Sequence, residues 1–101
     1  MSLDESQRRR TAEEFRANLE LAELQEHHFR EDLGMEPDEL AAIVAMDPGV
    51  RSDRVWLLRD YLDAAVRLRG RTPRPWATMT EPARAAADAW FGLAQAPTPR
   101  L

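Results

Sequence analysis

The sequence contains no cysteine, which excludes disulfides, iron–sulfur sites, cysteine-ligated zinc and thiol nucleophiles, and which fits a reducing compartment. Lysine is also absent, because all 14 basic residues are arginine, and we interpret this as the codon bias of a GC-rich bacterial genome. No apolar run approaches the roughly 18 residues that a membrane span needs. The opening MSLDESQRRR has no apolar stretch of the secretory kind. We therefore expect a cytoplasmic protein that has no membrane segment.

Glycine is scarce, and its four residues together with seven prolines divide the 101-residue chain into helical blocks. No stretch alternates polar and apolar residues as a half-buried strand does. The pattern predicts an all-α fold, a single domain of five helices over residues 1–93 followed by a disordered tail over 94–101. The expected helices span about 4–22, 25–33, 37–46, 52–69 and 80–91.

The first helix carries an apolar stripe of Ala12, Phe15, Leu19 and Ala22, and a capping box is expected at Thr11 and Glu14. In the fourth helix, which Ser52 is expected to cap, one broad face is apolar. Its residues are Val55, Leu57, Leu58, Tyr61, Leu62, Ala65 and Leu68. The opposite face is polar and consists of Arg59, Asp60, Asp63 and Arg67, with Trp56 in its middle.

Two prolines, Pro73 and Pro75, exclude a continuous helix over residues 71–79, for which we expect an ordered loop anchored by Trp76. Thr80 then caps the fifth helix. The residues Ala83, Ala86, Ala87, Trp90 and Phe91 share a face of that helix.

A helix-turn-helix is predicted at the centre of the chain, with Gly34 as the turn glycine and Pro37 in the first turn of the second helix. All five positions that such a motif buries are apolar. They are Phe29, Leu33, Met35, Leu40 and Ile43. Arg30 departs from the pattern, because a small residue is usual where the two helices cross.

Four segments, TAEEFRANLELAEL, EDLGMEPDEL, VWLLRDYLDAAV and RTPRPWATMTEPA, resemble a small helix-turn-helix family of unknown function that is common in actinobacteria. The family is domain of unknown function twenty-three sixteen. Gln25 and Arg30 differ from the hydroxyl and small residues expected in such a protein. The resemblance implies a DNA-binding-like fold, close to the five-helix repressor type, and no catalytic residues.

The second helix of the motif would read DNA through its outer face, which we assign to Glu36, Asp38, Ala41, Ala42 and Ala45. Residues 26–45 hold six acidic side chains and one basic side chain, a local charge of −5. Phosphate repulsion therefore opposes ordinary base reading.

Basic residues concentrate instead over 51–74, where seven arginines stand against three aspartates. Arg67, Arg69, Arg71 and Arg74 lie near Trp76, so they are candidates for contacts with DNA phosphates or with a partner protein. The interpretation we prefer is that they are solvated and pair locally, as Asp63 and Arg67 would four residues apart.

The alanine patch of the second helix suits close approach by another helix, which suggests a homodimer. Trp56 is a candidate partner anchor unless the 71–79 loop covers it. An enzyme is not expected, because there is no Gly-rich phosphate loop and several of the hydroxyl residues have capping or turn roles, and neither a cofactor nor a small-molecule substrate is inferred. A metal is not inferred either, because the adjacent His27 and His28 point about 100° apart on a helix and cannot chelate one ion together. Two hypotheses remain: a DNA-binding transcriptional regulator, or a protein-interaction (homodimerisation) module on the same fold.

Overall fold

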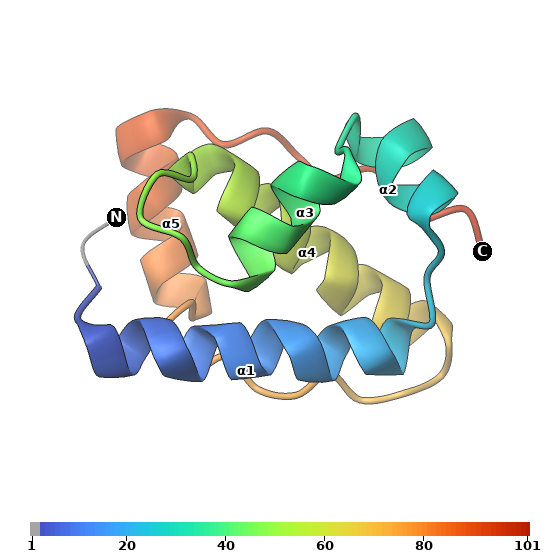
Figure 1. Ribbon diagram of the computed structural model, residues 1–101, viewed down its shortest axis with the longest axis horizontal. Coiled ribbons are helices and arrows are strands. Elements are labelled where there is room, and N and C mark those ends of the chain that lie inside the picture. The colour runs from blue at the N-terminus through green and yellow to red at the C-terminus, as the bar shows by residue number, and fades with distance from the viewer. Residues whose placement is uncertain (1–2) are drawn as a thin grey trace.

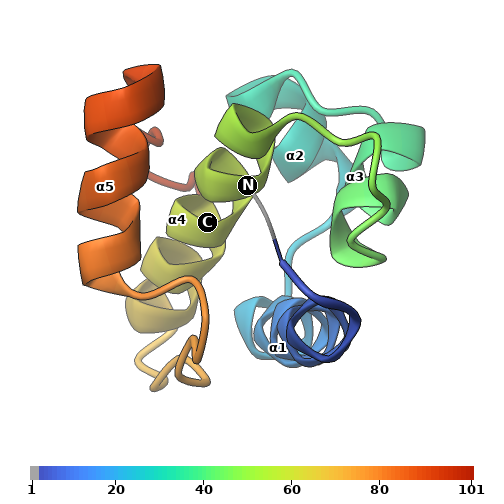
Figure 2. The ribbon, with the colours of Figure 1, turned by 90° about the vertical axis from the view of Figure 1, so that its left-hand side faces the viewer.

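The computed structural model describes residues 3–101. It is all-helical over that range, which confirms the predicted class, and its elements are α1 (Glu5–Ala22), α2 (Glu26–Leu33), α3 (Pro37–Val44), α4 (Ser52–Leu68) and α5 (Glu81–Phe91) (Figure 1). Seen from one end, α4 lies in the centre, with α5 on one side, α2 and α3 on the other and α1 below (Figure 2).

Helix α1 begins where Asp4 caps it. The Asp4 carboxylate accepts from the Gln7 N–H at 2.8 Å, and the Gln7 side-chain oxygen accepts from the Asp4 N–H at 3.1 Å. The capping box expected at Thr11 and Glu14 was wrong. Thr11 donates its hydroxyl to the Gln7 carbonyl at 2.8 Å, and Glu14 is buried, so both residues lie inside the helix. A helix that already has its cap at Asp4 leaves no free backbone N–H groups at Thr11 to be capped.

The turn between α2 and α3 occurs at Gly34, whose φ of 60° is the left-handed conformation that glycine adopts without strain. The N–H of Met35 donates to the Phe29 carbonyl at 3.1 Å and closes the end of α2. The apolar positions predicted for this helix pair point inward. Phe29, Leu33, Met35 and Ile43 are buried and Leu40 is half-buried against the same core.

Helix α4 is buried over more of its circumference than its sequence suggests. Arg59, assigned to a polar face, is only 5% exposed, whereas Leu68, assigned to the apolar face, is 54% exposed. The reason is tertiary: the loop after α4 and helix α5 cover the side that carries Arg59. Arg59 donates to the Met79 carbonyl at 3.2 Å and contacts Glu81 at 2.9 Å.

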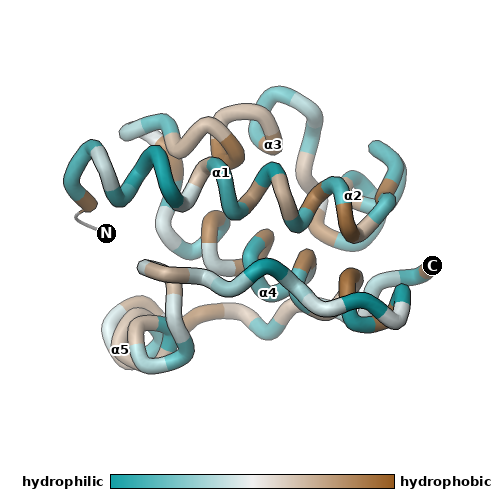
Figure 3. The backbone as a smooth tube through the Cα atoms, turned by 90° about the horizontal axis from the view of Figure 1, so that it is seen from below, coloured by the Kyte–Doolittle hydropathy of each residue, from teal (hydrophilic) through white to brown (hydrophobic). Residues whose placement is uncertain are grey.

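The 71–79 loop is ordered as predicted, and it runs alongside α1 below the core (Figure 3). Trp76 is buried and meets Phe15 edge-to-face, with 5.0 Å between the ring centroids. The Asn18 side chain accepts from the Arg74 N–H at 2.8 Å and donates to the Arg74 carbonyl at 3.1 Å. The aromatic contact and this polar clamp are two of the interactions that hold the loop.

The segment after α5, expected to be disordered, returns across the molecule to α2, and the C-terminus lies near that helix (Figure 1). Pro99 is buried, and the Arg100 N–H lies 3.4 Å from an Asp32 carboxylate oxygen. Tyr61 donates its hydroxyl to the same oxygen at 2.5 Å. Asp32 has a side chain only 6% exposed, so it needs these donors, and the tail supplies one of them.

Candidate interaction surface

The outer face predicted for α3 is where the sequence placed it, because Glu36, Asp38, Ala41 and Ala45 are exposed and Ala42 is half-buried. Arg30, the residue out of pattern, does not enter the crossing of the two helices. Its guanidinium remains at the surface, 3.2 Å from Glu36 and 4.0 Å from Glu26. The mismatch is therefore accommodated by an outward rotamer and two surface ion pairs.

Arg54, on α4, is also paired with a carboxylate of α3. Arg54 contacts Glu39 through two hydrogen bonds of 2.8 Å, and it donates to the Gly34 carbonyl at 3.3 Å. The hydrogen bonds from Arg54 hold the pKa of the Glu39 carboxyl below its ordinary value. Arg30 and Arg54 are thus both paired with carboxylates of the α3 segment. Neither guanidinium is a free cation on this surface.

Two of the four arginines proposed for phosphate contacts bind the carboxyl end of α1 instead. Arg69 donates to the carbonyls of Ala22 at 3.0 Å and Glu23 at 2.9 Å. Arg71 donates to the Leu21 carbonyl at 2.8 Å and forms an ion pair with Glu23. Both guanidinium groups satisfy carbonyls that the helix leaves unpaired and that carry its negative dipole end.

The other two arginines differ from each other. Arg67 pairs with Asp63 at 2.9 Å, four residues earlier, as the local-pairing interpretation predicts. Arg74 is exposed, and its backbone is the part held by Asn18. The four arginines therefore do not form one free basic surface.

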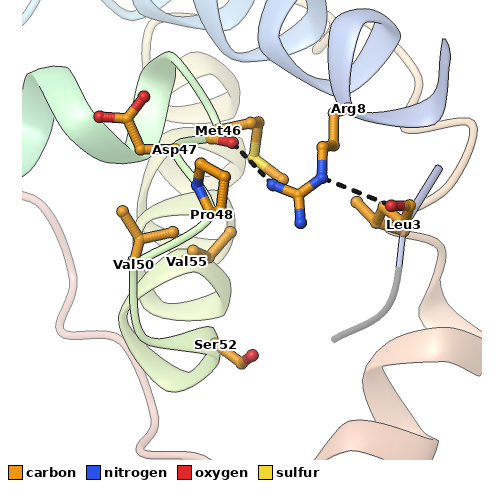
Figure 4. A pocket seen from close by; sticks show the side chains of 8 residues that line it. All are labelled: Leu3, Arg8, Met46, Asp47, Pro48, Val50, Ser52 and Val55. Carbon is orange, nitrogen blue, oxygen red and sulfur yellow. Dashed lines mark hydrogen bonds between the residues drawn. The ribbon is translucent and has the colours of Figure 1, made fainter. Parts of the chain in front are cut away.

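A small pocket lies between the start of α1, the end of α3 and the start of α4, lined by the eight residues labelled in Figure 4. Arg8 crosses it and donates to the carbonyls of Met46 at 3.0 Å and Leu3 at 3.4 Å. Its volume of about 30 Å³ is close to that of a single water molecule. Arg8 thus ties α1 to the end of α3, and the pocket is too small for an organic ligand.

Trp56 cannot serve as the partner anchor proposed from the sequence, because it is only 3% exposed. The structure covers it: Arg59 lies over the ring, with its guanidinium carbon 5.7 Å from the centroid, and α5 passes in front of it. A tryptophan between charged neighbours on one helix is thus explained by packing against another.

His28 has a local structural role. The His28 Nδ1 accepts from the Gln25 N–H at 3.0 Å and helps to cap α2. No group of three His, Asp or Glu side chains within residues 3–101 is arranged to hold a metal ion. None of the helices in that range is long and apolar enough to cross a membrane.

Helix α5 has three distinct faces, and the stripe predicted from its sequence is divided between two of them. The inner face carries Ala83, Ala87 and Phe91 toward α4. The charged face belongs to Glu81, Arg84 and Asp88.

The charged side chains of α5 all form bonds with other residues of the chain. Arg84 donates to Asp60 at 2.7 Å, which holds the pKa of Arg84 above its ordinary value, and Asp88 accepts from the Leu93 N–H at 2.8 Å. Glu81 is engaged by Arg59 at 2.9 Å. The charged residues of α5 are therefore engaged within the chain, although Glu81 and Asp88 remain exposed to solvent.

The third face of α5 is exposed and uncharged, and we call it the α5 stripe: Pro82, Ala86, Ala89 and Trp90. Trp90 is 84% exposed, the most exposed of the large apolar residues in the described range. Helix α5 is the outermost element on its side of the molecule (Figure 2), and all four residues of the stripe are exposed. The sequence pattern grouped Trp90 with the inward alanines. An expected pairing of the charged residues of α5 with residues of α4 would have placed Trp90 on the outer side of the helix.

A family model described as "Uncharacterized protein conserved in bacteria (DUF2316)" matches residues 1–92. The chain belongs to this family. The match confirms the resemblance to DUF2316 stated from the sequence segments, and it extends over all five helices. No curated protein and no solved structure matches the chain.

Proposed function

We propose that this protein is a non-catalytic protein-interaction module that forms a homodimer through the α5 stripe. The observation that carries the proposal is the orientation of α5. A surface helix normally covers its exposed side with polar residues, but this helix pairs Glu81 and Arg84 with residues of α4 and leaves Trp90 and alanines exposed to solvent on its other side. An exposed tryptophan on an uncharged helical face is typical of a protein contact.

A second copy is the partner that this surface fits best. A two-fold dimer places the same patch on both subunits, so the patch must complement itself. The α5 stripe has no charge to repel its own copy, and when two α5 helices run antiparallel, the Trp90 of each copy packs over the small residues Ala86 and Ala89 of the other. Alanines allow the two helices to approach closely, and the indoles fill the space that the alanines leave.

Light scattering and sedimentation velocity over a concentration series test the proposal. Wild type is expected to dimerise, and Trp90→Ala is expected to remain monomeric with unchanged helical content, because the side chain is 84% exposed in the monomer. Leu68→Ala is the matched control, since it removes another exposed apolar side chain that is not part of the α5 stripe. A wild-type protein that stays monomeric at millimolar concentration would refute homodimerisation.

Fluorescence gives an independent reading of the same contact. Of the three tryptophans, Trp56 and Trp76 are buried and Trp90 is exposed, so iodide should quench Trp90 selectively. Quenching is expected to decrease as the concentration rises and the dimer forms. A concentration-independent quenching constant would count against Trp90 as the anchor.

A DNA-binding transcriptional regulator of the repressor type is the second candidate, favoured by the close connection of α2 and α3 through Gly34 and by the inward side chains of both helices. Against it stand the acidic outer face of α3 and the internal use of Arg69 and Arg71. Fluorescence anisotropy with random and genomic duplexes, measured across salt concentrations, separates the candidates. A regulator binds more weakly as salt rises; absence of binding at low ionic strength removes this candidate.

A further inference from the structure

An apolar pocket lies between α4 and α5, separate from the α5 stripe. Its six lining residues are Leu3, Trp56, Thr78, Ala83, Ala87 and Phe91, and its volume is about 200 Å³. Trp56 of α4 lies on one side and Phe91 of α5 on the other. No charged side chain of residues 3–101 lines it.

The pocket exists because α5 carries alanine where a packed helix usually carries a larger residue. Ala83 and Ala87 face Trp56 and leave space that leucine would fill, and α5 has no fully buried residue. The nearby ionic groups Arg59 and Glu81 are bound to each other at 2.9 Å. A charged ligand would therefore lose its hydration without gaining a partner.

Apart from the indole N–H of Trp56, Thr78 is the one polar side chain in the lining. It is half-buried, and its hydroxyl makes no hydrogen bond with another residue in the range 3–101. A hydroxyl at the edge of an otherwise apolar pocket can orient a ligand that carries one hydrogen-bonding group.

We propose that this pocket binds a small, uncharged, monocyclic aromatic molecule with one hydroxyl group, of the phenol class. An apolar cavity of roughly 150 Å³ is enough to hold benzene, so a pocket of about 200 Å³ has room for a ring and one substituent. The ring lies against Phe91, which is 50% exposed, and contacts the small part of Trp56 that reaches the pocket, and the ligand hydroxyl bonds with Thr78. The proposal is independent of dimerisation, because Trp90 does not line the pocket.

Titration of the ¹⁵N-labelled protein with phenol and with benzene tests the proposal. The indole N–H resonances of Trp56, Trp76 and Trp90 are assigned by single Trp→Phe substitutions. We expect both ligands to shift the Trp56 resonance saturably, with phenol binding roughly 2- to 10-fold more tightly, the range of one net hydrogen bond. Thr78→Val should bring the two affinities together.

Ala87→Leu fills the pocket and is expected to weaken both ligands at least about 10-fold without loss of helical content. Ala85→Leu is its matched control, because Ala85 is exposed and lies outside the pocket lining, so both affinities should stay unchanged. If Ala87→Leu does not fold, the Thr78→Val comparison still decides. The proposal is overturned if Trp56 shows no saturable shift, if Ala87→Leu binds as wild type does, or if phenol keeps its advantage in Thr78→Val.

The titration is repeated in Trp90→Ala to keep the two proposals distinguishable. Ligand binding should persist in that variant while the dimer is lost. A shift confined to Trp90 in wild type would indicate binding at the α5 stripe and would contradict the pocket assignment.

Discussion

Asn18 on α1 holds the backbone of Arg74 from both sides: its Oδ1 accepts from the Arg74 N–H at 2.8 Å and its Nδ2 donates to the Arg74 carbonyl at 3.1 Å. The two residues are 56 positions apart, and Asn18 is completely buried. This clamp fixes the loop that brings Trp76 against Phe15. It therefore joins the first helix to the segment that precedes the last one.

Asn18→Ala is expected to lower the free energy of unfolding by roughly 2–3 kcal/mol, because it leaves the partly buried N–H and carbonyl of Arg74 without their partner. Chemical denaturation monitored by circular dichroism measures the loss. Ala17→Gly, at the neighbouring half-buried position of the same helix, serves as a control that perturbs only the helix backbone, with an expected loss of about 1 kcal/mol. Equal losses in the two variants would show that the clamp contributes little.

Arg59→Ala is expected to destabilise the fold by about 2–4 kcal/mol, since it removes a buried guanidinium that bonds to the Met79 carbonyl and pairs with Glu81. Its guanidinium carbon also lies 5.7 Å from the Trp56 ring and 5.8 Å from that of Trp76, so both indoles lose a cover. Thermal unfolding gives the size of the effect, and tryptophan emission should shift to the red. Arg67→Ala, an exposed ion-paired arginine on the same helix, should cost less than about 1 kcal/mol.

Gly34→Ala is expected to cost about 1–2 kcal/mol, because an L side chain is strained at the φ of 60° that this turn requires. No atom lies within 4 Å of the added Cβ, so the cost comes from the backbone and not from a clash. Gly49→Ala is the matched control: its surroundings are equally open and its φ is not positive. Equilibrium unfolding of both variants measures the difference, and an equal cost would remove the argument for the turn.

Glu14 predicts a pH dependence. Burial raises the pKa of its carboxyl above the ordinary value of 4.5, although the Ala77 N–H and the nearby Arg74 oppose the shift. Between 4.5 and the raised pKa the folded protein holds a proton that the unfolded chain has released, so the free energy of unfolding decreases as the pH rises through this window. Glu14→Gln should lack this decrease.

Glu39 acts with the opposite sign and in a different window. Arg54 lowers the pKa of the Glu39 carboxyl. The stabilisation that this carboxylate adds to the free energy of unfolding is therefore present above pH 4.5 and is lost as the pH falls below that value. Denaturation curves of wild type and Glu14→Gln from about pH 3 to about pH 8 separate the two groups. A difference between the two proteins that does not change above pH 4.5 would contradict the role of buried Glu14.

Local signals in the sequence determined the helices. Pro37, Thr80 and the glycines at 34 and 92 are signals that act within one turn of chain, so the positions of α3 and α5 and the turn after α2 follow from neighbouring residues alone. The inward residues of α2 and α3 follow from helical periodicity for the same reason. The expected tie of Asp63 to Arg67 also spans a single turn.

The tertiary structure decided which surfaces are left free. Whether Trp56 is exposed depends on α5 and Arg59 covering it, and whether Trp90 is exposed depends on Arg84 and Glu81 turning the charged face of α5 toward α4. These ion pairs and the Asn18 clamp join residues 22 to 56 positions apart. Local periodicity does not reveal these contacts. The pattern of apolar residues in a helix is the same whether its apolar side faces the core or faces water.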